Sequence, residues 1–201
     1  MAFEAKTFNI GELVGISKKT IEEHLKLYAG YVKHANLILE KIAELSPDPE
    51  TATKNAYLIG ELRRRFGFEF DGMRNHEYYF EQLEGGKQID VAPDSKYMAQ
   101  INKDFGSFQA MSDQFKTLVM TRGIGWAMMY YDQTTQKLLL AWVDEQHLGQ
   151  LTGLKVVLAL DMWEHSYMLD YVPSEKAKYV EAFFKNINGE VLEKRFASYT
   201  A

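Results

Sequence analysis

The sequence predicts an α+β protein, in which an N-terminal antiparallel helical hairpin packs on a C-terminal domain with a three-stranded antiparallel sheet flanked by helices. Two observations lead to this expectation. Residues 17–83 contain two long segments in which apolar residues recur at helical spacing. Residues 125–161 contain three short segments rich in β-branched and aromatic residues, separated by turn-like stretches. Helices followed by sequence-adjacent strands are typical of this class, so we expect two domains, residues 1–88 and 89–201.

The first helix is expected to begin after Ser17, whose hydroxyl suits an N-cap, and to end before Pro47. The second should run from about residue 51 to 83, where a glycine pair ends it. Two glycines in its middle, in "FGFEFDGM", allow a bend there. Two such helices with a short connection form an antiparallel hairpin. The apolar face of the first helix comprises Ile21, Leu25, Tyr28, Val32, Ala35, Leu39 and Ile42.

The C-terminal half is expected to hold a helical segment, three strands and a final helix. Residues 95–122 have helical character, and the strands are expected at 125–132, 137–143 and 155–161. A last helix over residues 175–187 should close the chain before the Asn-Gly pair that follows it.

Composition excludes several classes of function. The chain has no cysteine, which excludes disulfides, zinc–thiolate sites, iron–sulfur clusters and thiol catalysis. Its formal net charge of −5 argues against nucleic acid as a partner. The N-terminus lacks the pattern of a signal peptide, and no apolar run approaches the roughly 18 residues that cross a bilayer. We therefore expect a soluble cytoplasmic protein with neither membrane nor nucleic-acid partners.

Three of the five histidines occupy informative positions. His24 and His76 lie within the two predicted hairpin helices, and His165 lies four residues after Asp161, where a predicted strand ends. A hairpin packed against the end of the sheet could bring these four groups together. Three imidazoles and one carboxylate suit manganese, iron or zinc. For each histidine taken alone, a surface or core role without metal is the more common outcome.

Several motifs resemble those of the iron/manganese superoxide dismutase family, and the resemblance extends over most of the chain. The stretch "DMWEHSYMLDY" at residues 161–171 is similar to that family's D-x-W-E-H-[AS]-Y-x-L-x-Y signature. The stretches "DFGSFQAMSDQFK" and "GIGWAMMYYD" resemble its FGS-F helix and G-x-GW strand. "ISKKTIEEH" resembles the start of its first ligand helix, and "NH" at 75 and 76 matches its second ligand.

The resemblance implies an antioxidant oxidoreductase, a superoxide dismutase, that converts its small-molecule substrate superoxide to oxygen and hydrogen peroxide. It implies a homodimer in which Glu164 reaches the last histidine ligand of the partner subunit and Tyr167 lies near the interface. It also places Trp126 and Trp163 close to the ion. The resemblance implies that each subunit holds one manganese or iron ion through His24, His76, Asp161 and His165.

The chain departs from the family pattern after His24. Family members commonly place a tyrosine eight residues beyond the first ligand, whereas here Tyr28 and Tyr31 lie four and seven residues beyond it. In a regular helix, with about 100° per residue, Tyr31 lies within roughly 20° of His24. We therefore expect a helix without a bulge, and Tyr31 as the phenol at the entrance. Tyr28 replaces a family histidine and Met168 replaces the tyrosine that pairs with it, so the proton path at the entrance should differ.

Gln146 is the candidate for the outer-sphere glutamine that holds solvent on the ion. Gly72 occupies the position from which iron-type members more often supply that glutamine. The arrangement is manganese-like, and a cambialistic enzyme, active with either metal, stays open. Lys176 stands about where the family keeps an arginine beside the channel, so we expect it to steer the superoxide anion.

Two other functions stay open at the level of sequence. A protein of the same fold could bind metal for structure or storage without turnover, because the entrance residues Tyr28 and Met168 are altered. A hydrolytic metalloenzyme is less favoured, since no spare carboxylate lies near the ligands to act as a general base.

Overall fold

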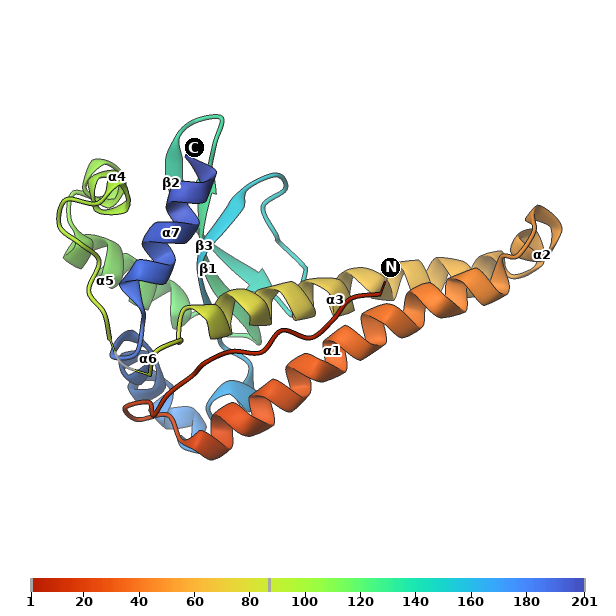
Figure 1. Cartoon of the computed structure of the whole chain (residues 1–201), viewed down its shortest axis with the longest axis horizontal. Coiled ribbons are helices and arrows are strands. Elements are labelled where there is room, and N and C mark those ends of the chain that lie inside the picture. The colour runs from red at the N-terminus through yellow and green to blue at the C-terminus, as the bar shows by residue number, and fades with distance from the viewer. Residues whose placement is uncertain (1, 87, 201) are drawn as a thin grey trace.

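The computed structural model describes residues 2–86 and 88–200. Helices come first along the chain, three strands follow, and two further helices end it (Figure 1). In chain order the elements are α1 (Lys18–Leu45), α2 (Pro49–Lys54), α3 (Ala56–Glu81), α4 (Lys96–Phe105), α5 (Phe108–Val119), β1 (Gly125–Asp132), β2 (Lys137–Asp144), β3 (Lys155–Asp161), the 3-10 helices η1 (Glu164–Ser166) and η2 (Pro173–Glu175), α6 (Lys176–Phe184) and α7 (Gly189–Tyr199).

The long helices α1 and α3 form the predicted hairpin. They lie side by side and extend away from the rest of the molecule, with the short helix α2 at their far end (Figure 1). The Ser17 hydroxyl caps α1 by accepting from the backbone N–H of Thr20, as expected of an N-cap serine. The predicted second helix is divided, because Asp48 caps the separate turn of α2 before α3 begins. The near end of the hairpin packs against β3 and η1.

Helix α3 runs without interruption through Gly67 and Gly72, the two glycines of the "FGFEFDGM" stretch. The allowance for a bend was therefore unnecessary, and the second of the two glycines has a packing role. A Cβ atom built on Gly72 would lie 2.5 Å from the Cδ1 atom of Tyr31. Glycine at this position lets the Tyr31 ring of α1 lie directly against the backbone of α3.

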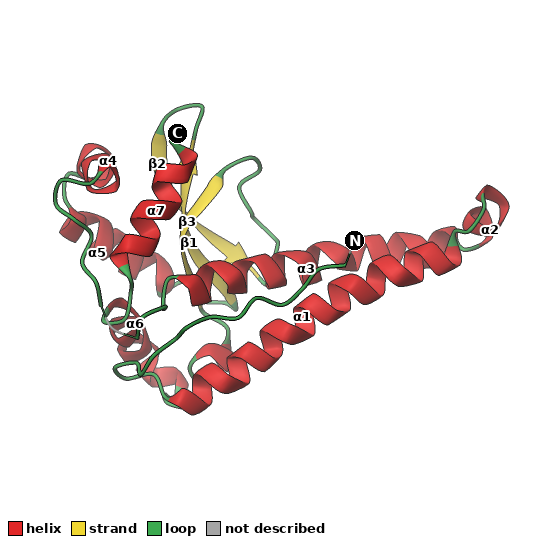
Figure 2. Cartoon of the chain, viewed as in Figure 1, coloured by secondary structure: helices red, strands yellow, loops and turns green. Residues whose placement is uncertain are grey.

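The sheet is antiparallel with strand order β2-β1-β3, which confirms the predicted class (Figure 2). The central strand β1 is buried along nearly its whole length, as expected for a strand covered on both faces. Helix α3 contacts β3, and α4, α5 and α7 supply further contacts to the three strands. The register pairs Trp126 of β1 with Asp161 at the end of β3. That pairing brings two of the predicted site residues together at one end of the sheet.

Two sequence expectations for the C-terminal half were wrong. The single helical segment at 95–122 is two helices, because Gly106 adopts a positive φ of 85° after α4 and Ser107 caps α5. The expected final helix does not close the chain, since α7 follows it. The Asn188 side chain caps α7 by accepting from the N–H of Val191. An Asn-Gly pair that suggests a stop is here the start of a helix.

Within the described part of the chain, no helix has both the length and the apolar character needed to cross a bilayer.

Candidate metal centre

The four predicted ligands meet at one place in the fold. His24 comes from α1, His76 from α3, Asp161 from the last position of β3 and His165 from the 3-10 helix η1. The side chains of the first three are fully buried, and that of His165 is 21% exposed. One ligand atom from each residue lies within 4.8 Å of the others. Helices and a strand thus deliver three imidazoles and a carboxylate to a single point.

The spacing of the donor atoms fits one shared ion. The Nε2 atoms of His24 and His165 each lie 3.1 Å from Asp161 Oδ2, and His76 Nε2 lies 3.5 Å from the same oxygen. Donors about 2.1 Å from one ion, separated by about 90–120°, stand about 3.0–3.6 Å apart. The three distances all fall in that range.

The protonation state of His76 also favours a cation. Its Nδ1 donates to the carbonyl oxygen of Gly72 at 2.6 Å. Burial lowers the pKa of His76 to about 3, so the ring is neutral and Nε2 carries a lone pair. This Nε2 is buried and has no hydrogen-bond partner among the described residues. A lone pair facing a buried carboxylate oxygen is unfavourable unless a positive charge lies between them.

Asp161 is oriented by its own neighbours. Burial alone would raise its pKa, but the imidazoles of His165 and His24 hold the pKa of Asp161 well below its ordinary value, so the carboxylate is charged. Its Oδ1 accepts from the backbone N–H of Trp163 at 2.8 Å. Its carbonyl oxygen accepts from the hydroxyls of Ser166 and Tyr179, each at 3.0 Å. These bonds leave Oδ2 directed at the three imidazoles.

Gln146 lies fully buried beside the cluster, as its predicted role requires. Its Oε1 accepts from the indole N–H of Trp126 at 2.8 Å, and its Nε2 donates to the hydroxyl of Tyr31 at 3.0 Å. The Trp126 ring packs edge-on against His76 at 5.1 Å between centroids. An indole therefore fixes one side of the amide, and a phenol receives one of its two N–H groups.

Tyr31 lies toward the cluster, where the helical arithmetic placed it. Its ring centroid is 5.0 Å from that of His76. Helix α1 is a regular α-helix over its whole length, without a bulge between His24 and Tyr31. Burial, reinforced by the nearby carboxylates of Asp161 and Glu69, raises the pKa of Tyr31, so the phenol keeps its proton at neutral pH.

The residues expected near a subunit interface have different surroundings. Tyr28 is buried; its hydroxyl accepts from the N–H of Lys6 at 2.8 Å and donates to Glu77 at 3.3 Å, so it is used within the chain. Tyr167 is also buried, and its ring stacks on Tyr179 at 5.5 Å.

Glu164 and Met168 are exposed, and Glu164 belongs to none of the ion pairs formed by residues 2–86 and 88–200. These two residues therefore offer their side chains to the surface beside the cluster.

Trp163 and Lys176 complete the set of predicted residues. The Trp163 ring stacks on His165 at 5.8 Å between centroids, with an interplanar angle of 19°. It covers the one ligand that is partly exposed. Lys176 lies at the start of α6, where its Nζ donates to the carbonyl of Thr121 at 3.4 Å and sits 5.7 Å from the centre of the Trp142 ring. These contacts are with the segment before β1 and with β2.

The sequence alone did not indicate two further residues at the site. Asn75 is buried and donates through Nδ2 to the carbonyl of Gln146 at 2.8 Å. The Phe68 ring contacts the rings of Tyr31 and Trp163, at 6.0 and 6.4 Å between centroids. Asn75 directly precedes His76, and that position was the available signal. Phe68 belongs to a stretch whose apolar residues indicate one face of a helix and gave no signal of a role at the site.

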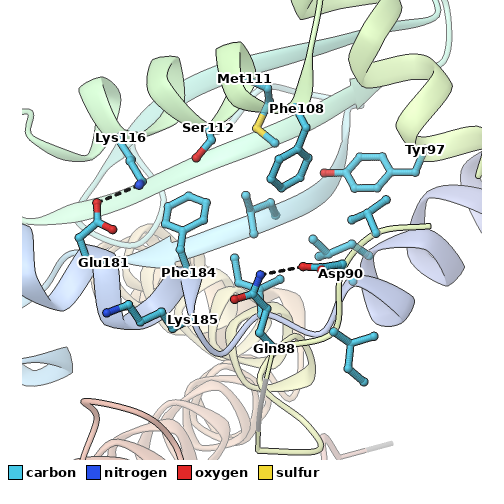
Figure 3. A pocket seen from close by; sticks show the side chains of 16 residues that line it. Gln88, Asp90, Tyr97, Phe108, Met111, Ser112, Lys116, Glu181, Phe184 and Lys185 are labelled. Atoms are coloured by element: carbon cyan, nitrogen blue, oxygen red, sulfur yellow. Dashed lines mark hydrogen bonds and ion pairs between the residues drawn. The ribbon is translucent and has the colours of Figure 1, made fainter. Parts of the chain in front are cut away.

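A separate cavity lies away from these residues. It has a volume of about 190 Å³ and is lined by α5, α6, the first turn of α7 and residues 88–91 (Figure 3). Its floor is apolar, and its rim carries the ion pair between Lys116 and Glu181 at 2.8 Å. None of the four clustered ligands lines it. The chemistry of the site therefore belongs to the buried cluster and not to this cavity.

Comparison with known proteins gives consistent results. The family model for the C-terminal domain of iron/manganese superoxide dismutases matches residues 93–195. The iron superoxide dismutase of Aquifex pyrophilus is 34% identical over 92% of this chain and 85% of its own length. That of Cupriavidus metallidurans is 34% identical over 98% of both chains. The manganese superoxide dismutase of Mycolicibacterium paratuberculosis is 32% identical over 89% of this chain and 83% of its own length.

Proposed function

The chain belongs to the iron/manganese superoxide dismutase family, and on that premise we propose how its residues carry out the dismutation of superoxide. The reaction converts two superoxide ions and two protons to oxygen and hydrogen peroxide. The observation that carries the assignment at this site is the meeting of three Nε2 atoms and one carboxylate oxygen beside a buried amide and phenol. We propose one ion per subunit, because the described residues offer one such cluster.

We propose that His24, His76, Asp161 and His165 hold the ion. When held by these residues, manganese or iron would supply the one-electron redox chemistry that the dismutation needs. The protein residues keep the donor atoms in place before binding, because the hydrogen bonds of His76 and Asp161 fix both the tautomer and the carboxylate orientation. Donor atoms fixed in this way need to move little when the charge of a bound ion changes.

We propose that Gln146 and Tyr31 handle hydrogen bonds and protons next to the ion. An amide carries two N–H groups, and only one of those on Gln146 donates to Tyr31. The other is available to solvent or superoxide. The Tyr31 oxygen accepts in that bond, so the phenolic proton is available for donation to reduced oxygen. Trp126 and Trp163 enclose the space on two sides, which limits access of bulk water.

We propose a manganese-like arrangement in which either metal can work. Support comes from Gln146 lying beside the cluster while Gly72 leaves space for Tyr31. The named relatives include both iron and manganese enzymes, and the ligand set itself suits both ions.

We propose a homodimer in which Glu164 reaches His165 of the partner subunit. Support comes from the exposed side chain of Glu164, its absence from the ion pairs of the described segments, and the exposure of the neighbouring Met168. Sedimentation analysis tests this: a dimer that Glu164→Ala weakens is expected, and a monomer at micromolar concentration would contradict it.

We also propose a domain division, an antioxidant role and a cytoplasmic location. The domains are residues 1–88 and 89–201, supported by the start of the C-terminal family match at residue 93. The protein acts as an antioxidant in the cytoplasm, a placement supported by the absence of cysteine, which fits a reducing compartment.

Metal loading tests the activity. The protein is stripped of metal, loaded separately with manganese, iron or zinc, and assayed for superoxide decay by stopped-flow absorbance. We expect decay with manganese, iron or both, and none with zinc, which has no redox chemistry. Tight binding of manganese and iron without decay in either case would show a metal-binding protein of this fold that is not a dismutase.

A further inference from the structure

The last residue of β2 and the first two residues of the loop that follows it accept a hydrogen bond from each of the three tryptophans of the chain. The three indole N–H groups donate to three consecutive residues: Trp142 to Asp144 Oδ1 at 2.7 Å, Trp163 to the Glu145 carbonyl at 3.0 Å, and Trp126 to Gln146 Oε1 at 2.8 Å. Glu145 has a φ of 51°, in the left-handed region that non-glycine residues seldom adopt. A strained residue among three indole hydrogen bonds indicates that the position of this loop is functionally constrained.

A second set of hydrogen bonds holds the main chain of Gln146. Its carbonyl accepts from Asn75 Nδ2 at 2.8 Å and from Gln150 Nε2 at 3.5 Å. Gln150 Nε2 also donates to Asn75 Oδ1 at 3.0 Å, and Gln150 Oε1 accepts from the hydroxyl of Tyr130. Gln150 therefore joins Asn75 of α3, which directly precedes His76, to Tyr130 of β1.

These groups are buried and uncharged. Asn75, Tyr130 and Gln146 are at most 2% exposed, and Gln150 is half-buried. Removing the Gln150 amide leaves the hydroxyl of Tyr130 and one acceptor of Asn75 without this partner. Buried amides and hydroxyls without partners shift to find others, and the carbonyl of Gln146 lies in the middle of the set.

We propose that Gln150 is a positioning residue for the reaction. Together with Tyr130 and Asn75 it fixes the position of the Gln146 main chain. That position determines how the Gln146 side-chain amide is oriented toward Tyr31 and the ion. The inference rests on the proposed function for its kinetic consequence. Gln150 itself touches neither substrate nor ion. Displacements of about 1 Å at a reacting group can lower rates about a hundredfold, so a bond to the main chain is sufficient to matter.

The test compares Gln150→Leu with Gln109→Leu, the same change at an exposed position of α5 where the side chain donates to Asp113. The first measurement uses zinc-loaded protein labelled with ¹⁵N at the indoles. Three indole N–H resonances are expected, one for each tryptophan. In Gln150→Leu we expect the Trp126 resonance to move upfield as its bond to Gln146 lengthens. In Gln109→Leu all three should keep their positions.

The second measurement uses manganese-loaded protein. We expect Gln150→Leu to retain full metal content, to lose about tenfold in kcat, and to move the midpoint potential by about 59 mV, the equivalent of a tenfold change in a one-electron equilibrium. Tyr130→Phe should have a smaller effect in the same direction. The double variant should match Gln150→Leu alone, because both changes break one connection.

An unchanged Trp126 resonance together with an unchanged potential in Gln150→Leu would overturn the proposal, and so would additive effects in the double variant. If Gln150→Leu fails to fold, Gln150→Glu serves instead, because it keeps the side-chain shape and removes the donor to Asn75. Absence of superoxide decay in the unmodified protein would reject the proposed function, whereas the indole measurement would still decide whether Gln150 positions Gln146.

Discussion

Gly72→Ala perturbs the site without replacing any proposed ligand. The new Cβ would lie 2.5, 2.7 and 3.0 Å from three atoms of the Tyr31 ring. Carbon atoms in contact prefer separations of about 3.5–4.0 Å, so the ring must move by about 1 Å. The Tyr31 hydroxyl now lies 3.0 Å from Gln146 Nε2, and a move of that size breaks the bond. Overpacking typically costs about 1–3 kcal/mol, which the better helix propensity of alanine offsets by about 1 kcal/mol.

Gly60→Ala is the matched control on the same helix. Its Cβ would meet nothing within 4 Å, so only the propensity gain of about 1 kcal/mol applies. We expect Gly60→Ala to raise the melting temperature at full activity. Gly72→Ala should be up to about 2 kcal/mol less stable than wild type, by the balance above, and should lose superoxide decay about tenfold or more in the manganese-loaded protein. Full activity in Gly72→Ala, or equal stabilisation by both changes, would refute the packing of Tyr31 on α3.

Further predictions concern pH, salt and metal removal. Burial raises the pKa of Asp71 to about 6, so the folded state holds this proton more tightly and its stability falls as pH rises from about 4 to 6. After allowance for partial exposure, Asp71→Asn should be more stable than wild type by about 1 kcal/mol at pH 7.5 and little changed at pH 4, as urea titrations would show; equal stability at pH 7.5 would contradict this. Lys176→Gln should slow superoxide decay most at low ionic strength, and an unaltered salt dependence would remove its steering role. Chelation of the ion should lower the melting temperature, since an ion present at a thousandfold above its Kd stabilises by about 4 kcal/mol; calorimetry with and without metal measures this, and identical melting curves would argue against tight binding.

The cluster of His24, His76, Asp161 and His165 could be predicted from sequence because the D-x-W-E-H resemblance and the position of Asp161 at a strand end supplied strong local signals. Helical geometry alone predicted that Tyr31 lies on the same side of α1 as His24, because α1 is regular between these two residues. The sheet could also be predicted from local signals, because it is built from three β-rich segments that are close in sequence. Local periodicity carries this kind of information well.

Other features depend on contacts between residues far apart in the chain. The bonds of Asn75 to the Gln146 carbonyl and to Gln150 join residues more than 70 positions apart, and no local pattern predicts such pairs. Helix α7 was missed because Asn188-Gly189 was read as a stop. A Cβ on Gly189 would approach the Ile89 carbonyl oxygen to 2.6 Å, so glycine is there for packing against a distant strand-like segment. Glycine marks both helix ends and close approaches, and sequence does not separate the two.

In the proposed function, one redox ion is bound by four side chains from the hairpin and the end of the sheet. Diffraction data collected at the absorption edge of manganese or iron, from metal-loaded crystals, test it most directly. We expect one anomalous peak per subunit, about 2.1 Å from the Nε2 atoms of His24, His76 and His165 and from Asp161 Oδ2. A peak elsewhere, or one that His76 Nε2 does not approach, would contradict it.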